Sequence, residues 1–183
     1  MQILNGNGFV LRPWREDDAE NLVRHANNEK IAMNLRDGFP YPYTMQDARS
    51  WISMVRENRK DLVFAFEIEG EACGGIGLHG GQDVYRFNAE IGYWLSEKHW
   101  GRGYVTEAVR MLVSHGFEHY PWTRIHAGVF SNNPASMKVL SKCGFRREAV
   151  FKKSVKKRGR YLDEHVYSIL KEDWRKHTSP NST

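Results

Sequence analysis

A short segment with two glycines and an arginine is the strongest constraint on the fold of this chain. Residues 100–108 read Trp-Gly-Arg-Gly-Tyr-Val-Thr-Glu-Ala. Residues 89–95 before it are rich in strand formers, and apolar residues after it recur at helical spacing. Glycines let a backbone approach a ligand closely, and a helix start presents N–H groups without intrahelical acceptors. The segment therefore predicts a strand–loop–helix junction that binds phosphate groups; the alternative is a tight turn whose glycines serve only the turn.

Size and composition indicate one globular domain. The chain has 183 residues and is 40% hydrophobic, which is enough for a substantial core. No stretch is long and apolar enough to cross a membrane, and the first residues lack the regions of a signal peptide. We therefore expect a cytoplasmic protein without a membrane partner. Cys73 and Cys143 show no metal-ligand spacing, so we expect packing roles for both and no metal.

The basic excess is concentrated near the C-terminal end. The formal net charge is +5, and much of it lies in residues 152–160, Lys-Lys-Ser-Val-Lys-Lys-Arg-Gly-Arg. This segment is either a solvated hairpin or a surface for an acidic partner such as RNA or a phosphorylated ligand. Because base-stacking aromatics are not interleaved there, we favour the solvated hairpin, and proximity to the ribosome or RNA is the secondary expectation.

Hydrophobic periodicity and turn signals predict an α+β fold. The expected strands cover residues 9–12, 62–69, 72–79, 85–95, 124–130, 145–157 and 161–170. The expected helices cover residues 16–28, the segment after Thr44, the segment from Val105 to about Tyr120, and the segment from Asn133 to Gly144. These elements predict a mixed, mostly antiparallel twisted sheet of about seven strands with one parallel crossover, flanked by about four helices. Residues 1–177 are expected to form one domain, and residues 178–183 a disordered tail.

Three sequence blocks carry a family resemblance. They are Leu-Arg-Pro-Trp-Arg-Glu-Asp-Asp at 11–18, Ile-Gly-Tyr-Trp-Leu at 91–95 with the segment at 100–108, and Asn-Pro-Ala-Ser at 133–136 continuing to Phe145. In this order they resemble the GNAT superfamily of acetyl-CoA-dependent N-acetyltransferases, and within it the ribosomal-protein (RimJ/RimL-type) branch. The resemblance runs from about Phe9 to Trp174. It favours phosphate binding by residues 100–108 over a simple tight turn.

That resemblance implies transfer of an acetyl group from acetyl-CoA to a primary amine by direct attack in a ternary complex. The expected acceptor is a protein or peptide N-terminal α-amine, and a small-molecule amine is the alternative. The expected assembly is a monomer or a homodimer. A non-catalytic acyl-CoA sensor or a ribosome-docking module on the same scaffold is the alternative of another class.

The resemblance also implies a set of cofactor-binding residues. The pyrophosphate would rest on N–H groups of Arg102 to Thr106, and a bulge that Gly92 permits would free a strand N–H for the oxyanion. The expected acetyl-CoA-binding residues are Tyr93, Trp94, Leu95, Trp100, Gly101, Arg102, Gly103, Tyr104, Val105, Thr106, Asn133 and Ser136.

Three positions depart from the family pattern. Trp100 stands where the superfamily commonly has Gln or Arg, and Val105 where it has Gly or Ala. Because the expected contacts are largely backbone N–H groups, these changes need not spoil the site. Leu140 occupies the position of a tyrosine that protonates the departing thiolate in other branches, so that role does not carry over.

Two residues are the catalytic candidates. An α-amine, with a reference pKa of about 7.7–8.0, loses its proton more easily than lysine, at about 10.4, so a weak base suffices. Glu90 is the candidate base, or else an outward-facing strand residue. Ser136 would protonate or steady the thiolate and Asn133 would hold the pantetheine; both residues are also common at helix starts.

A competing motif is present at His115-Gly-Phe-Glu-His119, which fits the H-x-x-E-H pattern of certain zinc peptidases. Its histidines would share a helix face. They stand at a helix end, where histidines interact with the negative end of the dipole. Since the three blocks already explain the fold, an N-acetyltransferase is the favoured prediction.

Overall fold

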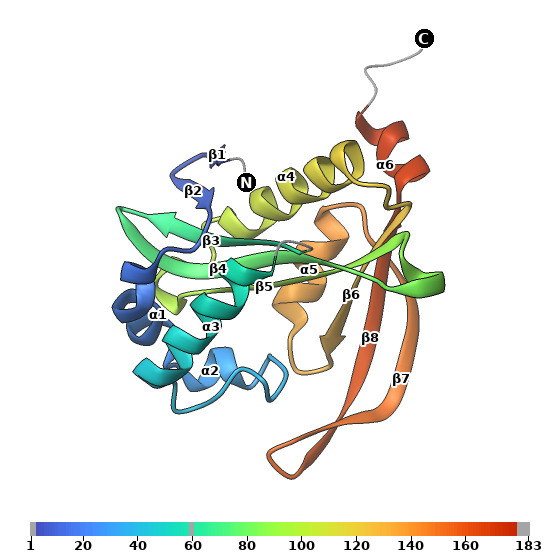
Figure 1. Ribbon diagram of the computed structural model, residues 1–183. Coiled ribbons are helices and arrows are strands. Elements are labelled where there is room, and N and C mark those ends of the chain that lie inside the picture. The colour runs from blue at the N-terminus through green and yellow to red at the C-terminus, as the bar shows by residue number, and fades with distance from the viewer. Residues whose placement is uncertain (1–2, 59–60, 179–183) are drawn as a thin grey trace. The chain divides into compact units, whose positions relative to one another are not determined.

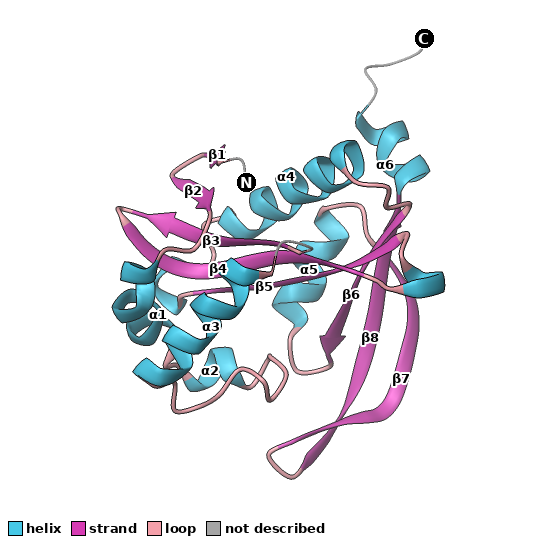
Figure 2. Cartoon of the chain, viewed as in Figure 1, coloured by secondary structure: helices cyan, strands magenta, loops and turns pink. Residues whose placement is uncertain are grey.

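The computed structural model describes residues 3–58 and 61–178, which form eight β-strands and six α-helices (Figures 1 and 2). The strands are mostly antiparallel with one parallel pair, so the predicted α+β class is confirmed. The chain divides into two compact units. The first unit comprises Met1–His79 and Gly92–Ala108, and the second comprises Gly80–Ile91 and Val109–Thr183.

Four antiparallel strands follow one another in the first unit. They are β1 (Leu4–Gly6), β2 (Phe9–Arg12), β3 (Leu62–Ile68) and β4 (Glu71–Gly80). Glu69 and Gly70 both have positive φ, 54° and 81°, in the turn between β3 and β4, which confirms the predicted hairpin. The end of β5 (Asn88–Leu95) lies beside β4, because Ser96 N donates to Cys73 O at 2.8 Å.

The helices of the first unit cover an apolar core. They are α1 (Ala19–Ala26), α2 (Glu29–Ala32) and α3 (Met45–Glu57). As predicted, Thr44 caps α3: its side chain accepts from Asp47 N, and Asp47 accepts from Thr44 N. The buried members of the core are Trp14, Ala19, Leu22, Ala26, Tyr43, Ala48, Ile52, Val63, Ala65 and Ala72.

A buried ion pair links β2 to the start of α1. Arg12 donates two hydrogen bonds to Asp18, each 2.7 Å, and both residues are 3% exposed. Arg12 also pairs with Glu67 on β3. Hydrogen bonding to the Asp18 carboxylate raises the pKa of Arg12 above its ordinary value. Such a pair fixes geometry, because removal of one partner leaves a charge buried without compensation.

The second unit contains the parallel crossover. The first half of β5 pairs with β6 (Arg124–Phe130), Asn88–Glu90 alongside Arg124–His126. The order then continues through β8 (Arg160–Leu170) to β7 (Arg146–Lys157), both antiparallel. The helices are α4 (Tyr104–His119), which begins in the first unit, α5 (Pro134–Lys142) and α6 (Lys171–Thr178).

The differences from the predicted elements lie at short or polar segments. The eighth strand is the three-residue β1, and α2 and α6 are the additional helices. Strand β5 begins at Asn88 because Asp83–Tyr85 forms a 3-10 turn. Thr178 ends α6, whereas residues 179–183 of the expected tail lie outside the described residues. None of the helices in the described ranges has the length and apolar character needed to span a membrane.

We predict that Asp18→Asn destabilises the fold by about 3 kcal/mol, since it leaves the Arg12 guanidinium buried and partly uncompensated. Urea unfolding followed by circular dichroism measures this free energy. Asp17→Asn is the matched control, because Asp17 is exposed and its loss should cost less than about 0.5 kcal/mol. Equal unfolding free energies for the two variants would contradict the structural role of the pair.

Candidate active site

The glycine segment forms the predicted strand–loop–helix junction. After β5 the chain makes a 3-10 turn at Glu97–His99 and enters α4 at Tyr104. Gly101 and Gly103 have φ angles of 76° and 84°, which L side chains rarely adopt. A Cβ added at either glycine would meet no atom within 4 Å. Both glycines are therefore required by the backbone, and the space beside them is open.

The open side of this loop presents the positive end of a helix. The N–H of Glu107 donates to Gly103 O at 3.1 Å, the i→i−4 bond that begins the ladder of α4. The N–H groups of Tyr104 and Val105 lie ahead of that ladder, where a helix carries partial positive charge. Arg102, an exposed cation, stands between the two glycines. The residues present thus fit an anionic group such as a diphosphate.

Side-chain contacts hold the loop in place. Trp100 Nε1 donates to Leu95 O at 2.7 Å, which ties the loop start to the end of β5. The ring of Tyr104 packs against Phe9, with centroids 5.6 Å apart. Both aromatic side chains therefore support the loop. The backbone N–H of Trp100 donates to Glu97 O at 3.1 Å, so it also serves the turn and is not available to a ligand.

Sequence reasoning missed two residues that shape this junction. His99 is 3% exposed, and neither ring nitrogen has a hydrogen-bond partner among the described residues. Burial, then the charges of Lys98 and Arg102, lower the pKa of His99, so its ring is neutral at neutral pH.

The second missed residue is Gly74 on β4. A Cβ at Gly74 would lie 2.5 Å from Trp94 O. The Gly-Gly pair at 74–75 was the available signal for this close approach.

Residues 93–95, at the end of β5, are the remaining predicted site residues in the first unit. Leu95 is buried, and Tyr93 and Trp94 are half-buried. The Trp94 ring meets Phe39 edge-on at 5.5 Å and packs on the core below α1 and α3. The bulge expected in this segment stays a prediction.

Glu90 lies in the second unit, opposite a histidine. It pairs with His126 in the parallel ladder of β5 and β6, and both are half-buried, so Glu90 is not a fully outward-facing residue. Burial and the charge of Arg124 lower the pKa of His126, whereas Glu90, a backbone hydrogen bond with Ala89 and Glu148 oppose that shift. Glu90 and His126 are thus close enough for the charge of the carboxylate to oppose the fall in the pKa of His126.

Asn133 and Ser136 begin α5 in the same unit. Asn133 Oδ1 accepts from Ser136 N at 3.1 Å, and Pro134 occupies the first helical turn. The predicted N-cap is confirmed. Because Oδ1 serves as the cap, any contact of Asn133 with a cofactor would be made by its Nδ2 group. Ser136 is half-buried.

A cluster in the first unit brings a histidine, a carboxylate and a cysteine together. Ligand atoms of His25, Glu71 and Cys73 lie within 4.8 Å of one another, a set that could hold a metal ion. Glu71 already binds His25 at 3.0 Å, Arg24 at 2.7 Å and Lys98 at 3.2 Å. The bond to His25, then that to Lys98, lowers the pKa of Glu71 to about 2. The group is an ion-pair network that links α1 to β4.

His115 and His119, the histidines of the H-x-x-E-H pattern, serve the end of α4. Their rings stack with centroids 4.4 Å apart. His119 Nδ1 is hydrogen-bonded to the His115 carbonyl at 3.0 Å, which satisfies one of the last carbonyls of the helix.

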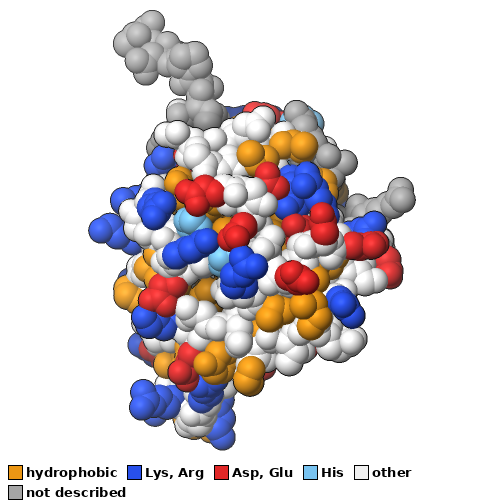
Figure 3. All heavy atoms as spheres, turned by 90° about the vertical axis from the view of Figure 1, so that its left-hand side faces the viewer, with side chains coloured by type: hydrophobic (Ala, Val, Ile, Leu, Met, Phe, Trp, Pro, Cys, Tyr) orange, Lys and Arg blue, Asp and Glu red, His pale blue; other side chains and the backbone are white. Residues whose placement is uncertain are grey.

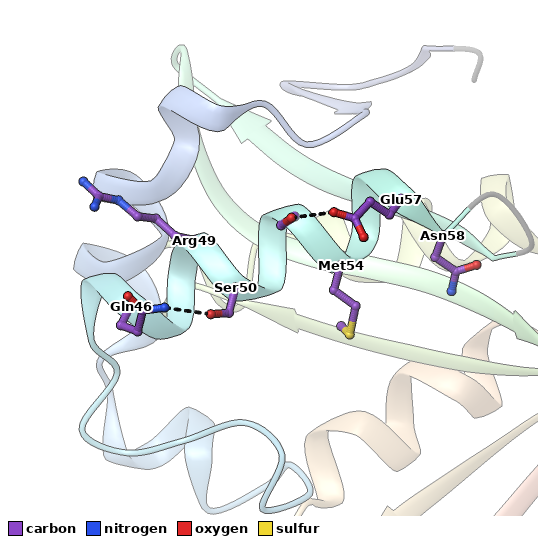
Figure 4. Close-up of a pocket in the computed structure, with 7 residues that line it drawn as sticks. Gln46, Arg49, Ser50, Met54, Glu57 and Asn58 are labelled. Carbon is purple, nitrogen blue, oxygen red and sulfur yellow. Dashed lines mark hydrogen bonds between the residues drawn. The ribbon is translucent and has the colours of Figure 1, made fainter.

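An open depression runs along the outer side of α3 (Figure 4). Two hydrogen bonds join its lining residues along the helix, from Gln46 to Ser50 and from Ser53 to Glu57. None of the predicted site residues lines it, and its lining residues are Gln46, Arg49, Ser50, Ser53, Met54, Glu57 and Asn58. We assign it no catalytic part.

The fold and the glycine junction define a known class of enzyme. Residues 9–146 match the acetyltransferase (GNAT) domain, and the chain belongs to this family of N-acetyltransferases. The "Probable N-acetyltransferase YjcK" of Bacillus subtilis is 34% identical over 181 residues, covering 93% of this chain and 98% of that protein.

Solved structures share the fold at lower identity. A GNAT-family acetyltransferase from Bacillus anthracis superposes with a TM-score of 0.81 at 24% identity, covering 93% of this chain and 99% of that one. RimL, a ribosomal L7/L12 alpha-N-protein acetyltransferase solved with coenzyme A, gives 0.82 at 20% identity, covering 92% and 98%.

We predict that Gly103→Val weakens acetyl-CoA binding by about tenfold or more, because a β-branched residue at this φ distorts the N–H groups of the loop. Isothermal titration calorimetry measures the affinity. Gly70→Val is the matched control: Gly70 has a φ of 81° with no atom within 4 Å of an added Cβ, so it shares the strain but lies in the β3–β4 turn. Unchanged affinity for Gly103→Val would count against the phosphate site.

Proposed function

We propose that this N-acetyltransferase uses acetyl-CoA to acetylate the α-amine of a protein or peptide N-terminus, as a member of the RimJ/RimL-type branch. The observation that carries the proposal is the loop at the start of α4, with two positive-φ glycines beside open space. Family membership supports the acyl donor. RimL and a ribosomal-protein-S5-alanine acetyltransferase from Vibrio fischeri, both 20% identical structural neighbours, are the source of the acceptor hypothesis.

The loop would hold the diphosphate of acetyl-CoA. The N–H groups from Arg102 to Thr106 would bind its oxygens, and the Arg102 guanidinium would add charge. The Asn133 Nδ2 group would hold the pantetheine arm. When bound, acetyl-CoA supplies an acetyl group activated as a thioester.

The residues of the chain would then manage protons and charge. The amine nitrogen forms the new C–N bond, and the C–S bond breaks. Glu90 accepts the amine proton, directly or through water, and later releases it to solvent. Ser136 donates a proton to the departing sulfur and regains one from solvent water, so both residues return to their starting states. A backbone N–H of the Tyr93–Leu95 segment stabilises negative charge on the carbonyl oxygen.

We predict that the enzyme releases thiol from acetyl-CoA steadily in the presence of peptides with a free N-terminus. A thiol-reactive dye follows turnover, and mass spectrometry places the acetyl group on the α-nitrogen. N-terminally blocked peptides that keep a lysine are the control, since a lysine amine is harder to deprotonate. Turnover only with polyamines or other small amines would contradict the peptide acceptor and indicate a small-molecule acetyltransferase. Binding of acetyl-CoA without turnover would indicate a sensor.

We predict that Glu90→Gln lowers kcat/KM mainly at low pH, by about 100-fold at most. Below the reference pKa of an α-amine, about 7.7–8.0, the nucleophile is protonated and needs a base; above it, the amine is already neutral. Rates across the pH range measure the effect, and an unchanged affinity for acetyl-CoA shows that the fold is intact. An equal loss of activity at every pH, or none, would remove Glu90 from proton transfer.

A further inference from the structure

The net charge of this chain resides in one hairpin. We define the basic hairpin as residues 146–164, from β7 through the turn into β8. It contains eight Lys and Arg residues against three Asp and Glu residues, an excess equal to the net charge of +5 for the whole chain. The other residues are therefore balanced, and the field that the protein presents to an acidic partner is focused here.

Two of the three acidic groups of the basic hairpin, Asp163 and Glu148, are already engaged. Asp163 binds Lys152 Nζ and the N–H of Lys153, both at 2.9 Å, and the first of these bonds lowers the pKa of Asp163. Glu148 accepts hydrogen bonds from Ser168 and from Arg124. Lys153, Lys156 and Arg160 are exposed. Figure 1 shows the turn that joins β7 to β8, and Figure 3 shows Lys and Arg side chains (blue) gathered at the lower end of its view.

The basic hairpin is joined to the loop that leads into α5. Ser131 N donates to Asp163 O at 2.9 Å, and Asp163 N donates to Ser131 Oγ at 3.2 Å. Two residues later, Asn133 begins α5 and is followed by Ser136. Within the second unit, a chain bound along the hairpin would therefore be held close to residues proposed for catalysis.

The surface fits a polypeptide better than RNA. Strand β7 lies at the edge of the second unit's strand order, so its outer side offers backbone groups to an extended chain. Single-stranded nucleic acid needs open aromatic faces for stacking. Two aromatic residues of the hairpin are strongly exposed, and the Lys156 ammonium lies 5.6 Å from the ring centroid of one of them, Tyr161. One face of Tyr161 is therefore shared with Lys156, and Phe151 is the other exposed aromatic residue of the hairpin.

We propose that the basic hairpin docks an acidic segment of the acceptor polypeptide, downstream of the N-terminal amine that is acetylated. This inference rests on the proposed function and names the substrate class: proteins whose N-terminus is followed by Asp and Glu residues. Exposed charges attract such a segment over roughly 10 Å at an ionic strength of about 0.1 M, and farther at lower salt, so docking acts on KM and on association more than on the chemical step.

Steady-state kinetics with paired peptides tests the proposal. Each pair shares its first residues and differs downstream, Glu against Gln. We expect kcat/KM to favour the acidic peptide about tenfold at low salt, through KM, and this ratio to fall as salt rises. In the triple variant Lys153→Gln, Lys156→Gln, Arg160→Gln, we expect the ratio to approach one.

The matched control removes the same charge elsewhere. Lys30→Gln, Arg49→Gln and Arg56→Gln change three exposed cations outside the hairpin, and this triple variant should keep the preference for acidic peptides. Acetyl-CoA affinity, measured by calorimetry for both variants, reports whether the donor site is intact.

The outcomes separate the two proposals. Turnover of both peptides with equal KM in the unmodified enzyme overturns the docking surface and leaves the proposed function standing. No turnover of any peptide overturns the proposed acceptor itself. An RNA oligonucleotide could instead displace the acidic peptide and bind more tightly than the peptide does. If the hairpin variant lost that RNA binding, the surface would be assigned to RNA and the polypeptide occupant would be overturned.

Discussion

The conformation of two glycines is the constraint on which the first unit's candidate site depends. Gly101 and Gly103 turn the chain from the end of β5 into α4 with positive φ, and they leave open the space that a side chain would fill. The hydrogen bond from Trp100 to Leu95 anchors one end of this turn, and the packing of Tyr104 on Phe9 anchors the other. These two contacts hold the turn at both ends, and such support favours the preorganisation that anion binding needs.

Elements with strong local signals were predicted closely, and those shaped by tertiary contacts were not. Strand β6 has its predicted bounds, and the caps at Thr44 and Asn133 form as expected, because a capping side chain acts over only three residues. Strand β1 has three residues, and α2 has four, so neither shows a period. Helix α6 is strongly polar and gives no apolar stripe.

The roles of the predicted site residues stay predictions, and the structure shows where those residues lie and what they contact. The glycine loop could be predicted because a turn with positive φ requires glycine, and glycine is visible in the sequence. The supporting contacts of Trp100, the burial of His99 and the pairing of Glu90 with His126 depend on residues distant in the chain. Asn133 shows the limit most clearly, since its amide oxygen serves as the helix cap while its nitrogen is the group proposed for the cofactor.

In the second unit, the basic hairpin is hydrogen-bonded to the loop that leads into α5, the helix whose first residues are proposed for cofactor binding and catalysis. The proposed donor site nevertheless depends on the glycine loop of the first unit. Backbone amide shifts, recorded by NMR while coenzyme A is added, test it most directly. The account predicts that the amides from Gly101 to Thr106 shift first and saturate together. Saturable binding that leaves these amides unshifted, or no binding at all, would contradict it.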